Sequence, residues 1–259
     1  MRRRARLIVA VLAVAVLALA GSSASAAPRG SGRKAAGSIT VFAASSLTEA
    51  FTKIGKDFEK KHPDATVTFS FNSSSTLETQ IEQGAPTDVF ASADDANMQK
   101  LVDADAIAGD PAVFARNRLE IAVEPRNPKK IESLADTVKG GVTLVLCVSE
   151  VPCGKYARQA YDKAGVSVPP VPTAENAKAT LSKVTLGEAD AAVVYVTDVK
   201  AAKGDASGVK IPAAQNVVAV YPIAPLVDAQ DGPLAKAFIR YVLSSSAQRT
   251  LGRFGFLHP

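Results

Sequence analysis

The chain has 259 residues, with 30 Lys and Arg against 25 Asp and Glu, which gives a formal net charge of +5. Seven of the basic residues lie in the first 34 positions, so 23 basic and 25 acidic residues remain from Ser38 onward. The body of the chain is therefore close to −2, and its composition does not support a nucleic-acid-binding protein. Two cysteines in a chain of this length also exclude a disulfide-dense fold.

The N-terminus has the pattern of an export signal. Four arginines within the first six residues precede the uninterrupted apolar run Leu7–Ala20. A membrane span needs about 20 apolar residues, and this shorter run is followed by small residues with an A-x-A site at Ala24–Ala26. The pattern predicts a signal peptide over residues 1–27, with an uncleaved anchor helix as the alternative.

The route and final tether of the exported protein stay open. The arginine cluster is compatible with the Sec route and with the twin-arginine route. Ser22 stands where a lipoprotein would carry its lipidated cysteine. The protein is therefore expected in a periplasm or extracellular cell-envelope space, either free or associated with the membrane. Residues 28–37, rich in Gly, Ser and basic side chains, are expected to form a disordered leader.

From Ile39 onward, short apolar runs alternate with helical periods, which predicts an α/β fold with mostly parallel sheets. Strands are expected at 39–44, 67–71, 88–91, 119–123, 142–148, 191–196 and 217–223. Helices are expected around 47–58, 77–81, 98–102, 156–161, 177–184, 234–242 and 251–254.

This order of elements predicts two lobes. The strands at 119–123 and 217–223 are expected to cross between the lobes, with the C-terminal helices returning to the first. Lobe 1 would then consist of residues 38–117 and 224–259, and lobe 2 of residues 118–223.

Enzyme and cofactor motifs are missing from the sequence. It has no dinucleotide fingerprint, no phosphate-loop lysine motif, no nucleophile elbow and no His-Glu-x-x-His. The two histidines, His62 and His258, have no cysteine or carboxylate at a spacing that suggests a triad or a zinc site. We therefore expect no catalytic residue, no cofactor and no resident metal.

Hydroxyl side chains gather where predicted strands turn into helices. Ser45-Ser46 follows the first strand, and the run Ser73–Thr76 follows the second. Helix N-termini offer unpaired N–H groups and a partial positive charge, which together suit an anion. Such ends meet at the carboxyl edge of a parallel sheet, where ligands of open α/β sheets bind.

These serines also fit a purely structural interpretation. Ser46 with Glu49, and Ser75 with Glu78, have the spacing of capping boxes, which stabilise helices without any ligand. The two interpretations can coexist, because a capped helix start still has free N–H groups.

The two cysteines allow two interpretations. Cys147 ends a predicted strand and Cys153 opens a predicted helix, so in an exported protein they could form a disulfide. The alternative is a Cys153 thiol acidified at the helix start, which would make the protein a secreted cysteine-dependent enzyme.

Several motifs resemble one family, the extracytoplasmic molybdate-binding proteins of ABC importers. They are spread over nearly the whole chain from Ile39 onward, and their combination is more specific than the serine cluster alone. The similar segments are 41–48 (VFAASSLT), 71–77 (FNSSSTL), 83–94 (QGAPTDVFASAD), 151–157 (VPCGKYA), 193–195 (VVY) and 252–256 (GRFGF).

The resemblance implies a two-lobed type II periplasmic binding protein fold that closes over an oxyanion. It implies that Ser46 and Ser74 supply hydroxyl and N–H donors, and that Tyr195 supplies its phenol O–H. Cys153 and Ala177 would supply backbone N–H groups. Ser45 is a further candidate, although relatives often have alanine there.

The function that this resemblance implies is capture of molybdate, and also tungstate, for delivery to an ABC permease by a monomeric solute-binding protein. Molybdenum would be present only within the bound oxyanion. Three alternatives stay open. They are the same fold with sulfate, phosphate or another tetrahedral oxyanion, the cysteine-dependent enzyme, and an interaction protein without a small ligand.

Overall fold

The computed structural model describes residues 36–259, which belong to one compact unit. The predicted signal peptide, and the leader before residue 36, lie outside the described residues. The first strand begins at Gly37, a residue that the sequence assigned to the leader.

The strands form a mixed sheet in the order β2-β1-β3-β9-β4-β7-β5-β6, with β8 paired to β4. The pairs β1–β2, β1–β3, β5–β6 and β5–β7 are parallel, whereas the pairs made by β4 and β9 are antiparallel. The strands are β1 (Gly37–Ala44), β2 (Ala65–Asn72), β3 (Val89–Ala91), β4 (Ala112–Val123), β5 (Leu144–Cys147), β6 (Thr173–Ala174), β7 (Ala191–Tyr195), β8 (Ser207–Lys210) and β9 (Val218–Pro225).

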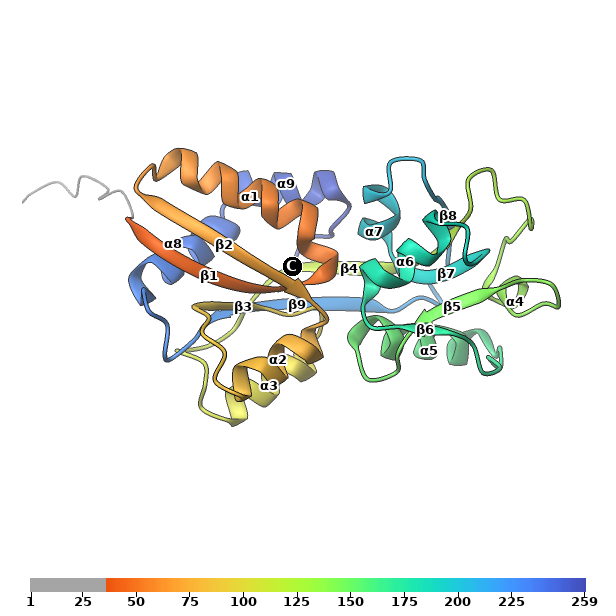
Figure 1. The fold of residues 1–259 in the computed structure, drawn as a ribbon, viewed down its shortest axis with the longest axis horizontal. Helices are drawn as coiled ribbons and strands as arrows, with labels where there is room; N and C mark the ends of the chain where they lie inside the picture. Colours follow the sequence, from red (N-terminus) through yellow and green to blue (C-terminus); the bar gives the residue numbers. More distant parts are fainter. Residues whose placement is uncertain (1–35) are drawn as a thin grey trace, which may run out of the picture. The chain divides into compact units, whose positions relative to one another are not determined.

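Helices cover both faces of the sheet in each half of the molecule (Figure 1). The first helical turn is the 3-10 element η1 (Ser45–Leu47). The α-helices are α1 (Thr48–Lys61), α2 (Ser74–Glu82), α3 (Asp95–Asp103), α4 (Leu134–Thr137), α5 (Pro152–Ala164), α6 (Ala177–Thr185), α7 (Val196–Ala201), α8 (Gly232–Val242) and α9 (Ser245–Phe254).

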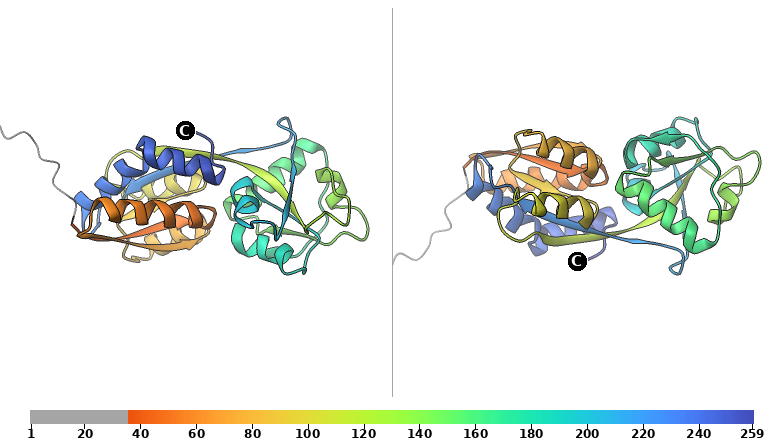
Figure 2. Two further views of the ribbon diagram at one scale, coloured as in Figure 1. Left: turned by 90° about the horizontal axis from the view of Figure 1, so that it is seen from above. Right: turned by 90° about the horizontal axis from the view of Figure 1, so that it is seen from below.

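Two strands, β4 and β9, run between the two lobes (Figure 2). The first part of β4, Ala112–Arg118, pairs with β9, whereas Leu119–Val123 pairs with β7 and β8. The chain thus changes sheet partner between Arg118 and Leu119. Helices α8 and α9 return to pack against α1.

The central strands β3, β5 and β7 read as continuous apolar runs because both of their faces are covered. In β1, Val41 faces the core around α1, whereas its neighbour Phe42 packs with Leu77 and Met98 of α2 and α3. In β5, Val145 similarly faces away from Leu146 and packs with Leu181 of α6. This alternation is the period-2 geometry of a strand.

Candidate oxyanion site

A small cavity lies where the carboxyl ends of β1, β2 and β7 meet the first turns of α5 and α6. All six residues predicted to contact an oxyanion line it. Its lining consists of Ala44, Ser45, Ser46, Asn72, Ser73, Ser74, Ala93, Pro152, Cys153, Asn176, Ala177 and Tyr195. A larger hollow lies at the end of α5, between Arg158 and Val168, but none of the predicted site residues lines it.

Ser46 does not cap a helix. The N-cap residue of α1 is Leu47, which makes no side-chain capping bond, so the capping box predicted for Ser46 and Glu49 is wrong. The Ser46 Oγ instead lies 2.8 Å from the Oη of Tyr221 on β9. Ser46 is only 4% exposed. Its hydroxyl is therefore held by the strand behind the cavity.

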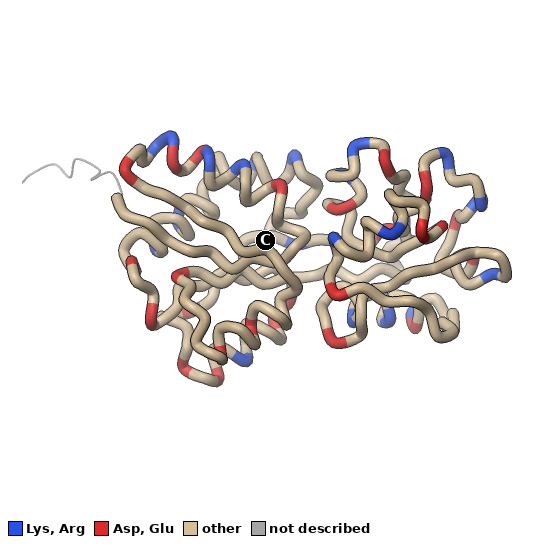
Figure 3. Tube along the Cα trace, in the orientation of Figure 1, with Lys and Arg blue, Asp and Glu red and all other residues tan. Residues whose placement is uncertain are grey.

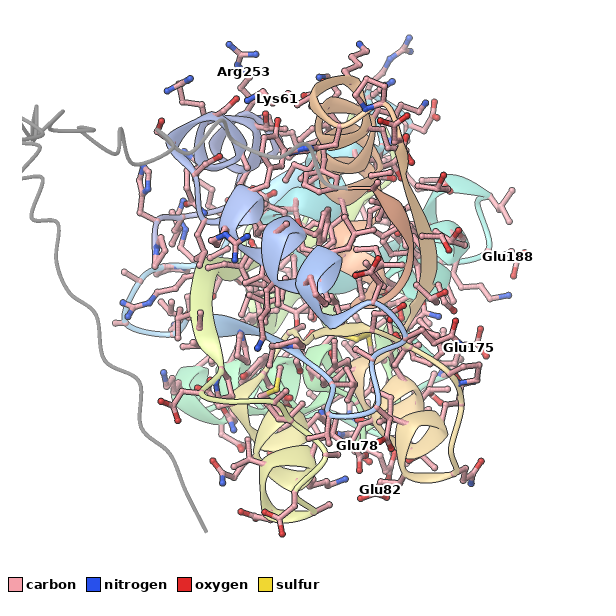
Figure 4. All side chains as sticks on the ribbon, turned by 90° about the vertical axis from the view of Figure 1, so that its left-hand side faces the viewer. Lys61, Glu78, Glu82, Glu175, Glu188 and Arg253 are labelled. Atoms are coloured by element: carbon pink, nitrogen blue, oxygen red, sulfur yellow. A yellow bond between two sulfur atoms is a disulfide. The ribbon has the colours of Figure 1, made fainter. Side chains whose placement is uncertain are left out.

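The capping box predicted for Ser75 and Glu78 is also wrong. Ser73 is the N-cap residue of α2 and accepts from the N–H of Thr76. The expected partner, Glu78, is buried and pairs through Oε2 with Lys100 of α3 at 3.0 Å. Figure 4 shows Glu78 beside Glu82, one turn further along α2. Because Ser73 caps the helix, the Ser74 side chain is available for other contacts.

Ser74, the first residue of α2, is 1% exposed. Its Oγ accepts a hydrogen bond from the backbone N–H of Ala93, with an N–O distance of 2.9 Å. A hydroxyl that accepts from one side keeps its own hydrogen for another partner. The Ser74 hydroxyl can therefore act as a donor toward the cavity.

Two helix starts supply backbone donors from lobe 2. Cys153 is the second residue of α5, and Ala177 is the first residue of α6. The N–H groups of a first helical turn have no partner within the helix, and the helix dipole adds positive potential there. Both helices begin at the cavity, so both direct these donors toward it.

Gly154 allows the start of α5 to approach the end of β5 closely. A Cβ atom at this position would lie 1.9 Å from the carbonyl oxygen of Val148 and 2.7 Å from that of Cys147. Both clashes are with backbone atoms, which cannot move aside cheaply. The absence of a side chain at Gly154 is therefore required for this arrangement.

Tyr195 ends β7 with its phenol buried. The residue is 2% exposed, and its Oη has no hydrogen-bond partner among the described residues. Its ring packs edge-on against Tyr221, with a centroid distance of 6.0 Å. Burial raises the pKa of this phenol well above its ordinary value, so it keeps its hydrogen. Tyr195 is therefore not a core tyrosine whose hydroxyl bonds to the backbone.

The lining of the cavity contains no charged residue. An ion pair between Lys178 and Glu49 joins α6 to α1, and Asp198 lies buried three residues beyond Tyr195. Over the whole of the described chain, basic and acidic residues are interspersed without one large region of a single sign (Figure 3). The attraction for an anion must therefore come from local dipoles.

Sequence reasoning missed two asparagines of the lining. Asn176 is the N-cap residue of α6 and accepts from the N–H of Ala179, and its position before Ala177 is a capping signal that could have been recognised. Its Nδ2 donates to the Oδ1 of Asn72 at 3.3 Å, and that oxygen also accepts from the N–H of Ser73. The Asn72 pairing depends on how the lobes meet, and no sequence pattern indicates it.

Cys147 and Cys153 are joined in a disulfide that links the end of β5 to the start of α5, with a Cα–Cα distance of 5.8 Å. No free cysteine exists among the described residues. The interpretation of Cys153 as a free nucleophilic thiol is therefore wrong. Within residues 36–259 there is also no cluster of metal-ligating side chains, and no helix there is long and apolar enough to span a membrane.

The family model for bacterial extracellular solute-binding proteins matches residues 39–257. Among curated proteins, the chain is 40% identical over 252 residues to the molybdate-binding protein ModA of Mycobacterium tuberculosis, covering 97% of each chain. It is 34% identical to ModA of Escherichia coli, covering 92% of this chain and 95% of that protein.

Among solved structures, the periplasmic molybdate-binding protein of Azotobacter vinelandii superposes with a TM-score of 0.77 at 19% identity, covering 85% of this chain and 99% of that chain. This match confirms the predicted fold class, a two-lobed periplasmic binding protein of mixed α/β structure. The family match and the identity with curated relatives together show that the chain belongs to the bacterial extracellular solute-binding proteins.

Proposed function

We propose that the protein captures molybdate, and also tungstate, in this cavity and delivers it to an ABC permease. The observation that carries the proposal is the buried Oη of Tyr195, which has no partner among the described residues although Tyr195 lines a cavity of donors. A buried polar group normally has a hydrogen-bond partner. A ligand that accepts hydrogen bonds would supply it. The curated relatives named molybdate-binding proteins support the choice of oxyanion.

In this proposal each site residue acts as a donor. Ser46, Ser74 and Tyr195 donate from their hydroxyl groups, and the backbone N–H groups of Cys153 and Ala177 donate from the two helix starts. The N–H of Ser45, in the turn beside Ser46, is a further candidate donor. Several preorganised dipoles can hold a buried dianion without a Lys or Arg.

The lining also suits an anion that carries no proton. Molybdate is fully deprotonated at neutral pH, so it needs donors and no acceptor. The Asn72 Oδ1 already accepts from two groups. A hydrogen phosphate ion must also donate its remaining proton, and the lining holds no carboxylate to accept it.

Capture would occur by closure of the two lobes, for which we propose the boundaries 38–117 with 224–259 and 118–223. The change of sheet partner between Arg118 and Leu119 supports the first boundary. The proposed donors come from both lobes, so only the closed form contacts the anion from both sides. A ligand that binds one form better shifts the population toward it.

The membership of the chain in an extracellular solute-binding family, together with the sequence of residues 1–27, supports export to the periplasm or cell-envelope space. We propose that the protein acts there as a monomer, that it has no enzymatic activity, and that the permease is its membrane partner.

Titration calorimetry with molybdate, tungstate, sulfate and phosphate tests the choice of ligand. The expected result is tight binding of molybdate and tungstate, with weak or no heat for sulfate and phosphate. Sulfate is the closest alternative, because it is also a tetrahedral dianion without a proton. Tight sulfate binding without molybdate heat would overturn the proposal.

Substitution of both site serines tests the location. Ser46→Ala with Ser74→Ala removes two donors, so the rise in Tm that molybdate produces in the wild-type protein should largely disappear. Ser182→Ala, which removes an exposed hydroxyl from α6, serves as the control and should keep the full rise. An undiminished rise in the double variant would place the ligand elsewhere.

A further inference from the structure

A row of buried polar side chains lies behind Ser46. The Tyr221 Oη is 2.8 Å from the Ser46 Oγ and 3.4 Å from the Nδ2 of Asn117. The same Nδ2 lies 2.9 Å from the Oγ1 of Thr197, at the start of α7. Asn117 and Tyr221 are fully buried. A buried polar row of this kind is expensive unless its members satisfy one another.

The register of the two crossing strands places this row. Asn117 on β4 is opposite Ala219 on β9, and Tyr221 follows two residues later. Side chains two residues apart on a strand share a face, so Asn117 and Tyr221 lie diagonally on one face of the sheet. Tyr195, opposite Leu119 on the other side of β4, lies on that same face.

The direction of the hydrogen bonds follows from the amide of Asn117. Its Oδ1 accepts from the N–H of Arg118 at 2.9 Å, which fixes the orientation of the amide. Its Nδ2 carries only hydrogens and must donate. The Tyr221 Oη therefore accepts from Asn117.

The Tyr221 phenol keeps its own hydrogen, because burial raises its pKa above the ordinary value. With Asn117 donating to its oxygen, that hydrogen is directed to the nearest acceptor, the Ser46 Oγ. Ser46 then accepts from behind, and its own hydrogen is left to face the cavity. Ser74 is in the same situation, because it accepts from the N–H of Ala93.

We propose that Tyr221, oriented by Asn117, is a positioning residue that fixes Ser46 as a hydrogen-bond donor toward the bound oxyanion. The inference rests on the proposed function and extends it to two residues that do not line the cavity. Burying the Asn117 amide and the Tyr221 hydroxyl in β4 and β9 costs free energy. The proposed positioning of Ser46 explains why these polar groups are there.

Tyr221→Phe tests this inference, because it removes the phenol oxygen and leaves the ring. The dissociation constant for molybdate, measured by calorimetry, should rise about tenfold, which corresponds to one lost hydrogen bond. Tyr161→Phe is the matched control. Tyr161 is equally buried and its Oη bonds to Thr137 at 2.6 Å, but it lies outside the lining of the cavity. Its substitution should lower Tm without changing the affinity.

A double-mutant cycle separates positioning from a general loss of structure. If Tyr221 acts through Ser46, Tyr221→Phe should have no further effect on affinity in a Ser46→Ala background. In a Ser74→Ala background it should keep its full tenfold effect. Equal effects in both backgrounds, or an unchanged affinity of Tyr221→Phe alone, would overturn the inference and leave the proposed function intact.

The wild-type titration distinguishes the two proposals. If the wild-type protein binds sulfate in place of molybdate, the proposed function fails. The cycle is then run with sulfate, and the positioning role is decided by the same comparison. A wild-type protein that binds none of the four oxyanions would overturn both.

Discussion

Asp198 is a buried carboxylate next to a proposed ligand residue. It is 1% exposed, its Oδ2 accepts from the N–H of Tyr195 at 3.1 Å, and its Oδ1 has no partner among the described residues. Burial raises its pKa from 3.8 to about 7. Lys178 and the hydrogen bond from Tyr195 oppose this rise, and Glu49 adds to it. The carboxyl group therefore changes charge near neutral pH.

This raised pKa predicts a pH-dependent stability. Between about pH 4 and pH 7 the folded protein holds a proton that the unfolded chain releases, so the free energy of unfolding should fall as pH rises through this window. The full shift of about three units corresponds to about 4 kcal/mol. Asp198→Asn keeps an acceptor for Tyr195 and removes the charge, so this decline should be absent.

Urea unfolding of the wild-type protein and Asp198→Asn at pH 4.5 and pH 8 measures the effect. The variant should gain stability relative to the wild type at pH 8 and be similar to it at the lower pH. Asp162→Asn, on the exposed side of α5, controls for loss of a surface carboxylate. Parallel pH profiles for the wild type and Asp198→Asn would contradict the prediction.

At the scale of elements, the long apolar segments were predictable from sequence. The strands and helices with clear periodicity were found within a few residues, because burial on one or both faces imposes that pattern. The short elements β6, β8, α4 and α7 were missed, since two to six residues carry too little periodicity. The first half of β4 was also missed, because Arg116, Asn117 and Arg118 read as a polar loop.

The same limit applies to the site. Ser46, Ser74 and Tyr195 stand at strand ends that sequence can locate, and the resemblance to a family marked them. Asn117 and Tyr221 could not be found, because their contact depends on the register between β4 and β9. Register between strands a hundred residues apart is set by tertiary packing, which no local pattern records.

The disulfide connects two elements that both serve the cavity. Replacing Cys147 and Cys153 by alanine removes the constraint on a short loop between β5 and α5, so the free energy of unfolding should fall by about 2–3 kcal/mol. The affinity for molybdate should fall as well, because the N–H of residue 153 is then held only by the helix start. Urea unfolding with and without reductant provides the measurement.

The double alanine variant also serves as the control for unspecific effects of the reductant. It should lower the unfolding midpoint of the wild-type protein and leave that of the double alanine variant unchanged. A wild-type midpoint that is insensitive to complete reduction would show that the cross-link does not contribute to stability.

At the scale of the whole described chain, three polar contacts beside the cavity join α1, α2 and the end of β2 to the segments around the starts of α5 and α6. The Ser75 Oγ donates to the carbonyl oxygen of Glu150 at 2.9 Å, and Asn176 donates to Asn72. Lys178 of α6 forms an ion pair with Glu49 of α1. In the proposed open form these three contacts would be broken, so we expect them to stabilise the closed form.

Glu49→Gln tests the contribution of the ion pair. Removing a negative charge near the cavity would by itself favour a dianion, but loss of the pair disfavours closure. We expect closure to dominate, with the dissociation constant for molybdate rising about two- to fivefold at low salt. Glu59→Gln, further along α1, is the control for a change of net charge. Tighter binding of molybdate by Glu49→Gln would contradict this expectation. It would show that removing the negative charge near the anion outweighs the loss of the ion pair.

The direction of β1 also determines how the protein can be attached to a surface. The cavity lies at the carboxyl end of this strand, just after Ala44, while Gly37 is at the opposite end. Seven residue steps of about 3.3 Å separate them by about 23 Å. A linker or fusion partner joined at the start of β1 therefore attaches at the end remote from the ligand, which leaves the donors at the helix starts accessible to solutes.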